Sequence, residues 1–172
     1  CEQIVGDIFY FDIFKLILTW NPQVIIHTAW VTTYELYKND QINFKYAEFT
    51  QELAEIITKT DTKHLIVLGS CAEYGTQYST STAGVTKLSP TNIYAEQKVN
   101  ALNIIRETLL KSNKRLSWAR IFHPYGPGQD RQRLIPYLIN SIKEHKNFEL
   151  NNTTTRYDWI TTRDIASAIS WI

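Results

Sequence analysis

The sequence Leu-Ile-Val-Leu-Gly at residues 65–69 is a short apolar run that ends at a glycine. Four consecutive apolar residues without polar alternation predict a strand that is buried on both faces, as in parallel sheets. Similar runs precede and follow it at residues 24–26 and 116–122. Stretches with apolar residues at helical spacing separate these runs, at about residues 39–59 and 91–111. This alternation predicts an α/β fold whose doubly wound parallel sheet is built from right-handed βαβ units and covered on both faces.

Shorter elements follow in the C-terminal third of the chain. Helical spacing predicts a helix at about residues 132–143, and apolar residues predict a short strand near residues 148–150. A final helix is expected to begin near Asp164. In a sheet of this kind, ligands collect beyond the carboxyl ends of the strands. Functional residues are therefore expected just after residues 26, 68 and 122.

The composition of the 172-residue chain narrows the class of protein. The chain is 44% hydrophobic and 20% charged, which supplies a folded core and excludes a disordered tail. Eighteen basic residues against seventeen acidic ones leave a net charge of +1. Because no basic run is present, neither nucleic acid nor a membrane surface is expected as a partner. No apolar run approaches the roughly 18 residues that cross a bilayer.

Cysteine and methionine usage adds three expectations. Cys1 and Cys71 are too few for a disulfide framework, which favours a reducing, cytoplasmic setting. Four histidines and two cysteines show no metal-ligand spacing, so no metal is expected. The chain has no methionine and begins with a cysteine, so we expect it to be an internal piece of a longer protein.

The segments after the second strand carry residues suited to chemistry. Ser70 stands at the strand end and can donate a hydrogen bond to a substrate oxygen, although such a serine is more often a turn or cap residue. Tyr94 and Lys98 are four residues apart and share one face of the predicted helix. A nearby ammonium is expected to lower the pKa of the Tyr94 phenol and make it a usable proton donor or acceptor. Tyr34 and Lys38 have the same spacing, but only Tyr94 follows a strand-end serine, 24 residues earlier.

With these motifs in this order, the sequence resembles the extended short-chain dehydrogenase/reductase family of sugar-nucleotide epimerases, dehydratases and 4-ketoreductases. The matching segments run in order through nearly the whole chain: Gly6 to Ile8, Val24 to Ala29, Asn43, Ser70 to Gly75, Pro90 with Tyr94 and Lys98, Arg120 to Gly128, Leu134 to Pro136, and Tyr157 to Ala166.

The resemblance implies an arrangement of two domains. Residues 1–122 would form an NAD(P)-binding, Rossmann-like domain without its first βαβ unit, and residues 123–172 would form part of a substrate-binding domain. The family's glycine-rich phosphate turn is not found in the sequence, so the missing part is expected before residue 1. We therefore expect the fragment to bind dinucleotide poorly or not at all and to be inactive by itself.

The resemblance also implies roles for individual residues. Tyr94 would move the hydroxyl proton, Lys98 would hold the cofactor ribose and tune Tyr94, and Ser70 would hydrogen-bond the sugar oxygen. The cofactor, which supplies hydride chemistry, would be NAD or NADP, because the residue that selects between them lies in the missing part. The implied cofactor contacts are Asp7, Ile8, Thr28, Ala29, Trp30, Asn43, Tyr94, Lys98 and Phe122.

Departures from the family patterns narrow the reaction. The dehydratase branch has an Asp-Glu pair where this chain has Cys71 and Ala72, and Glu73 stands one place too late, so dehydration is disfavoured. The fucose-synthase branch has a cysteine at the position of Ala72 and a histidine near Arg133, so 3,5-epimerisation is also disfavoured. A nucleotide-sugar 4-epimerase or 4-ketoreductase with hydride transfer at a sugar carbon remains. The alternative is a non-catalytic NAD(P)-binding scaffold or regulatory protein, against which the retention of all three catalytic candidates argues.

A further group of residues is expected to contact the nucleotide-sugar substrate: Cys71, His123, Arg133, Leu134 and Arg156. His123 replaces the family's usual asparagine and is either a sugar or phosphate contact or a loop histidine packed on Tyr125. The two arginines suit bidentate phosphate binding, although surface arginines are commoner. The two long predicted helices resemble those that pair in family dimers, so a homodimer is expected.

Overall fold

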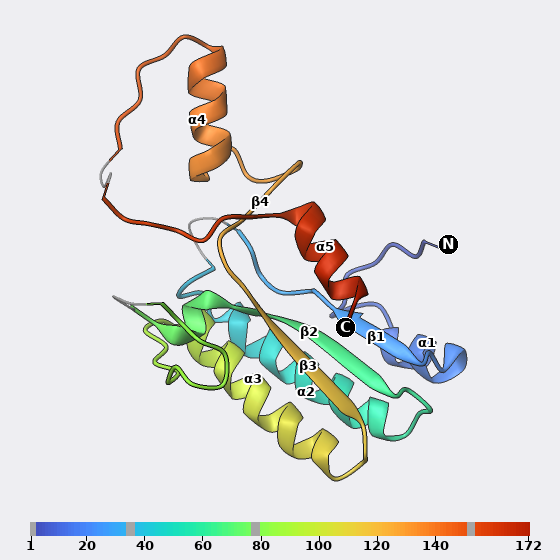
Figure 1. Cartoon of the computed structure of the whole chain (residues 1–172). Helices are drawn as coiled ribbons and strands as arrows, with labels where there is room; N and C mark the ends of the chain where they lie inside the picture. The colour runs from blue at the N-terminus through green and yellow to red at the C-terminus, as the bar shows by residue number, and fades with distance from the viewer. Residues whose placement is uncertain (1–2, 34–36, 77–79, 151–153) are drawn as a thin grey trace.

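The computed structural model describes residues 3–33, 37–76, 80–150 and 154–172, so Cys1 and Tyr34 lie outside the described residues. Its centre is a three-stranded parallel sheet in the order β1-β2-β3 (Figure 1). The strands are β1 (Val24–His27), β2 (His64–Ser70) and β3 (Arg115–Ile121). The predicted α/β fold with a parallel sheet is confirmed, and the three predicted strands differ from the observed ones by at most two residues at each end.

Three helices pack against one face of this sheet and form the hydrophobic core with it. They are α1 (Ile13–Trp20), α2 (Ile42–Thr58) and α3 (Ile93–Leu110). Leu65 and Val67 of β2 project into this layer and are completely buried. Their main partners from the helices are Ile17, Leu53, Ala54, Ile57, Ala101, Ile105 and Leu109. Burial of side chains of this kind contributes about 1.5–3 kcal/mol each, which holds α2 and α3 in register with the sheet.

Strand β1 is less buried than its apolar sequence predicts. Val24 and Ile26 are each 50% exposed, whereas Ile25 packs on the core and His27 contacts α2. The prediction of a strand buried on both faces was therefore wrong for β1. In the described part of the chain β1 is an edge strand, and its alternating exposure follows from the two-residue period of a strand.

The C-terminal segment forms a second, two-stranded parallel sheet. β4 (Pro124–Tyr125) pairs with β5 (Ile160–Thr161), and α5 (Thr162–Ser170) packs against both strands. α4 (Leu134–Lys143) begins two residues after its predicted start. The strand predicted near residues 148–150 was wrong, because these residues are exposed and pair with no strand among the described residues.

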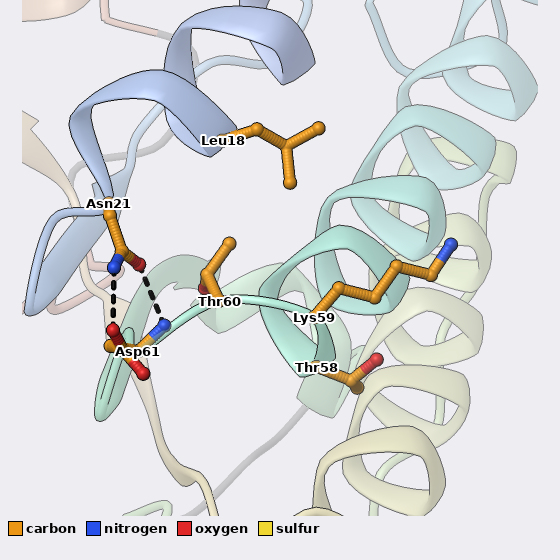
Figure 2. A pocket seen from close by; sticks show the side chains of 6 residues that line it. All are labelled: Leu18, Asn21, Thr58, Lys59, Thr60 and Asp61. Atoms are coloured by element: carbon orange, nitrogen blue, oxygen red, sulfur yellow. Dashed lines mark hydrogen bonds between the residues drawn. The ribbon is translucent and has the colours of Figure 1, made fainter.

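Helix α1 was not predicted, because eight residues are too few for a clear helical period. The Asp12 carboxylate accepts a hydrogen bond from the Lys15 amide and begins α1, and Asn21 ends it with a left-handed φ of 46°. The Asn21 side chain donates to the Asp61 carboxylate at 2.7 Å and accepts from the Asp61 amide at 2.7 Å (Figure 2). This reciprocal pair joins the end of α1 to the loop between α2 and β2. No helix in the four described ranges has the length and apolar character to cross a membrane.

Candidate functional site

The carboxyl end of β2 presents Ser70 at the start of the short 3₁₀ helix η1 (Cys71–Tyr74). The Ser70 side chain accepts a hydrogen bond from the Ala72 amide at 3.2 Å. The Ser70 side chain is also close enough to the Tyr94 phenol and the Cys71 thiol to act on the pKa of each, lowering it against the effect of burial. Burial raises the pKa of the Cys71 thiol, so this thiol is a weak nucleophile in this environment.

Tyr94 lies in the first turn of α3, whose start is fixed by the Asn92 side chain accepting from the Ala95 amide at 3.0 Å. The Tyr94 amide donates to the Lys38 carbonyl at 2.9 Å, which ties this turn to the segment after β1. The Tyr94 ring meets the Tyr37 ring edge-on, with centroids 5.1 Å apart. Burial raises the pKa of Tyr94 to about 12, and the hydrogen bond from Ser70 acts in the opposite direction.

Lys98 follows Tyr94 by one helical turn and is only 3% exposed. Its ammonium donates to the Leu68 carbonyl of β2 at 2.7 Å and lies 3.8 Å from the centroid of the Trp30 ring. Burial lowers the pKa of Lys98 to about 7, partly opposed by the charge of Glu73. The prediction that this ammonium lowers the pKa of Tyr94 was wrong for this structure. Burial dominates the phenol, and the ammonium is held by a carbonyl and an indole instead.

Trp30 and Asn43 form the wall beside Lys98. The indole Nε1 of Trp30 donates to Asn43 Oδ1 at 2.8 Å. The Asn43 Nδ2 donates to the carbonyls of Tyr37 and Asp40 at 2.7 and 2.8 Å. Asn43 is fully buried, so its polar atoms bind within the chain rather than face a ligand. Asn43 was predicted as a cofactor contact, and in this structure its side chain instead supports the Trp30 indole.

Glu73 was not among the predicted site residues, yet its carboxylate joins the end of β2 to two side chains of β3. Its buried carboxylate accepts from the Ser70 amide at 2.7 Å, from Trp118 Nε1 at 2.9 Å and from Arg120 Nε at 2.6 Å. All three donors are satisfied at once, so Glu73 positions the end of β2 and is not free for proton transfer. The Ser-x-x-Glu spacing of a capping box was the available signal for the contact with Ser70. The pairing with Arg120, 47 residues later, had no local signal.

The other predicted cofactor contacts lie around the end of β1 and the end of β3. Thr28 is exposed, Ala29 is half-buried, and Asp7 is exposed with its carboxylate accepting from the Phe9 amide at 2.9 Å. Ile8 packs against the core beside α2. Phe122 follows β3 and meets the Tyr74 ring at 6.1 Å between centroids.

The predicted substrate contacts do not form one cluster. His123 adopts φ 30° and packs on Tyr157 and Trp159, with ring centroids 4.5 and 5.5 Å away. Its ring partners are thus different from the expected Tyr125. The His123 backbone lies near the Cys71 thiol and acts to lower the pKa of this thiol, against the effect of burial.

Arg133 reaches toward the Tyr94 region from the start of α4. It donates to the Thr32 carbonyl at 3.3 Å, and its guanidinium lies 5.4 Å from the Tyr37 ring centroid. Leu134 beside it is 38% exposed, whereas Arg156 is exposed in the segment before β5. Of the two arginines, the structure brings Arg133 near the site.

Comparisons with known proteins show the family and the fold of this chain. Residues 6–172 match the family described as the NAD dependent epimerase/dehydratase family. Among solved structures, the fold is similar to a UDP-N-acetylglucosamine 4-epimerase from Methanobrevibacter ruminantium, with a TM-score of 0.83, 20% identity and coverage of 96% of this chain and 55% of that one. A dTDP-glucose 4,6-dehydratase from Streptomyces venezuelae with NAD bound gives a TM-score of 0.76 and 19% identity, covering 96% and 52%.

A third similar structure is a UDP-glucuronic acid 4-epimerase from Bacillus cereus in complex with UDP-glucuronic acid and NAD. Its TM-score is 0.73 at 19% identity, over 96% of this chain and 53% of that one. The chain therefore spans about half the length of these matched structures.

Proposed function

Because the chain belongs to the NAD dependent epimerase/dehydratase family, we propose that this protein acts on nucleotide sugars as an NAD-dependent 4-epimerase or 4-ketoreductase. The observation that carries the proposal is the packing of α3 against η1 at the carboxyl end of β2, which brings Tyr94 close enough to Ser70 for the serine side chain to lower the pKa of the phenol. An alcohol and a phenol in contact are suited to hold a sugar hydroxyl and move its proton.

The residues present are suited in chemistry to a dinucleotide cofactor. Thr28 is an exposed hydroxyl at the end of β1, and Lys98 is an amine one helical turn beyond Tyr94. We assign Thr28 and Lys98 to the phosphate and ribose oxygens, and Asp7 with Ile8 to the adenine end. Such a cofactor supplies hydride transfer when it is bound. The match to complexes that contain NAD favours NAD over NADP.

The remaining roles in the proposed reaction belong to Tyr94 and Ser70. With a pKa of about 12, Tyr94 is protonated at neutral pH and serves as a proton donor to a sugar oxygen. Ser70 hydrogen-bonds the same oxygen and orients it. Glu73 is the acidic residue nearest to Ser70 in sequence, and its carboxylate already accepts hydrogen bonds from three donors. It is therefore not available as the acid or base of a dehydration, which supports a reaction without elimination of water.

Replacing Tyr94 by phenylalanine tests the proposed proton transfer. In the full-length protein, Tyr94→Phe keeps the ring packing and removes only the hydroxyl, so turnover of UDP-glucuronic acid or UDP-N-acetylglucosamine with NAD should fall at least about 100-fold. The matched control is Tyr10→Phe, because the Tyr10 side chain is 91% exposed, and it should leave turnover unchanged. Equal turnover in Tyr94→Phe and the unmodified protein would rule out the role of the phenol.

A non-catalytic NAD-binding scaffold is the second candidate function. Two observations favour it, namely the high pKa of the Tyr94 phenol and the enclosure of the Lys98 ammonium. Binding of NAD without turnover of any nucleotide sugar by the unmodified protein would support it. The 100-fold loss described above would exclude it.

A further inference from the structure

The Trp30 indole lies over the Lys98 ammonium. The indole centroid lies 3.8 Å from the Lys98 ammonium, which is van der Waals contact for a cation on an aromatic face. The ammonium already donates to the Leu68 carbonyl at 2.7 Å, and Lys98 as a whole is 3% exposed. An oxygen ligand such as a ribose diol therefore has no open approach to this ammonium while the indole is in place.

The indole is held in this position from three directions. Its Nε1 donates to Asn43, which is anchored in turn by two backbone carbonyls. The Tyr46 ring stacks on it, with centroids 5.6 Å apart at an interplanar angle of 25°. The Tyr94 ring meets it edge-on at 6.4 Å. Trp30 is itself 8% exposed, so the outer side of the indole is close to the surface.

From this arrangement we propose that Trp30 is a positioning residue that controls access to Lys98. A ligand oxygen reaches the ammonium only when the indole is displaced or removed, so the size and ring character of residue 30 decide whether Lys98 is available. This inference rests on the proposed function for its ligand, a dinucleotide ribose. The closure itself is a property of the chain without any ligand.

Lysine reactivity measures the closure directly. We would acetylate the folded chain with an N-hydroxysuccinimide ester at pH 8 and follow each lysine by mass spectrometry. Lys114 is the matched control, because its ammonium also donates to a backbone carbonyl, that of Thr60, at 2.7 Å, and it is half-buried away from Trp30. In the unmodified chain Lys98 should react at least 10-fold more slowly than Lys114, even though its lowered pKa of about 7 leaves most of its amine in the reactive neutral form at pH 8.

Substitution of the indole should open the site. In Trp30→Ala the Lys98 rate should rise at least 10-fold while the Lys114 rate stays the same. An unchanged Lys98 rate with an unchanged Lys114 rate would overturn the proposal. If both rates rise together, the Trp30→Ala substitution has destabilised the whole fold, and the Trp30→Phe variant is then used as the test. It keeps an aromatic ring in the core but cannot donate to Asn43, and it should raise the Lys98 rate about threefold, whereas no rise would again overturn the proposal.

A second measurement separates this proposal from the proposed function. Addition of NAD to the Trp30→Ala variant of the full-length protein should protect Lys98 from acetylation at least threefold and leave Lys114 unprotected. Failure of NAD to protect Lys98, once the indole is shown to control its reactivity, would count against the dinucleotide function and leave the closure established. Protection of Lys98 by NAD in the unmodified chain to the same extent as in Trp30→Ala would count against the closure.

Discussion

Replacing His27 by glutamine should remove about 3 kcal/mol of acid destabilisation between pH 6.5 and pH 4. His27 ends β1 with only 7% of its surface exposed and lies 3.1 Å from the Thr50 hydroxyl through Nε2. The Thr50 hydroxyl donates to the Tyr46 carbonyl at 2.6 Å, so Nε2 of His27 carries a hydrogen and donates to Thr50. The Phe49 ring, with its centroid 5.7 Å away, adds an apolar neighbour. The imidazole is thus built into the core in its neutral form.

The magnitude follows from the two protonation states. Burial, and to a smaller extent the charge of Lys98, lowers the pKa of His27 from 6.5 to about 4. Between these values the unfolded chain binds a proton at His27 and the folded chain does not, so the free energy of unfolding falls as the pH falls. The stabilisation is complete above pH 6.5 and lost once the pH reaches about 4. A difference of about 2.5 pKa units at 1.36 kcal/mol each corresponds to about 3 kcal/mol.

Urea unfolding followed by circular dichroism at half-unit steps from pH 7.5 to 3.5 measures this contribution. The difference in free energy of unfolding between the unmodified chain and His27→Gln should shrink by about 3 kcal/mol across the window. His145→Gln is the control, because His145 is exposed beyond α4, and its difference from the unmodified chain should stay constant. Parallel pH curves for the unmodified chain and His27→Gln would refute the assignment of a buried neutral imidazole.

Two further stability predictions use matched pairs of residues and urea unfolding at pH 7. Glu73→Ala should cost about 3–5 kcal/mol, because it removes a fully buried carboxylate and leaves a half-buried guanidinium and a half-buried indole without their acceptor, whereas Glu48→Ala on the exposed face of α2 should cost under about 0.5 kcal/mol. A loss below about 1.5 kcal/mol for Glu73→Ala would contradict its organising role. Asn21→Ala should cost about 1–2 kcal/mol more than Asn113→Ala, since both residues have a positive φ but only Asn21 exchanges two hydrogen bonds with Asp61. Equal losses in the two variants would assign the whole effect to the backbone conformation.

Much of the fold could be predicted from local pattern. The apolar runs at β1, β2 and β3 and the helical spacing of α2 and α3 located five elements, because parallel strands and long amphipathic helices carry strong periodic signals. The two-residue strands β4 and β5 carry no such signal. They exist because Pro124 and Tyr125 meet Ile160 and Thr161 in space.

The candidate site divides in the same way. The proximity of Ser70 and Tyr94 could be predicted from the sequence. The carboxyl ends of parallel strands share one edge of the sheet, and the first turn of the predicted helix lies near that edge. The state of Lys98 could not be anticipated. The same four-residue spacing that aligns it with Tyr94 is compatible with an open ammonium that lowers the pKa of the phenol and with an enclosed one that does not.

Lys98 is enclosed because Trp30, 68 residues earlier in the chain, lies over its ammonium. The Glu73 carboxylate likewise forms an ion pair with Arg120 of β3, so it has a structural role and is not available as an acid. The periodicity of a helix or a strand depends on the spacing of residues near in sequence, so the linear pattern reveals it. Desolvation of an amine and pairing of a carboxylate depend on which distant side chain occupies a few ångströms of space, and only the packed chain determines that.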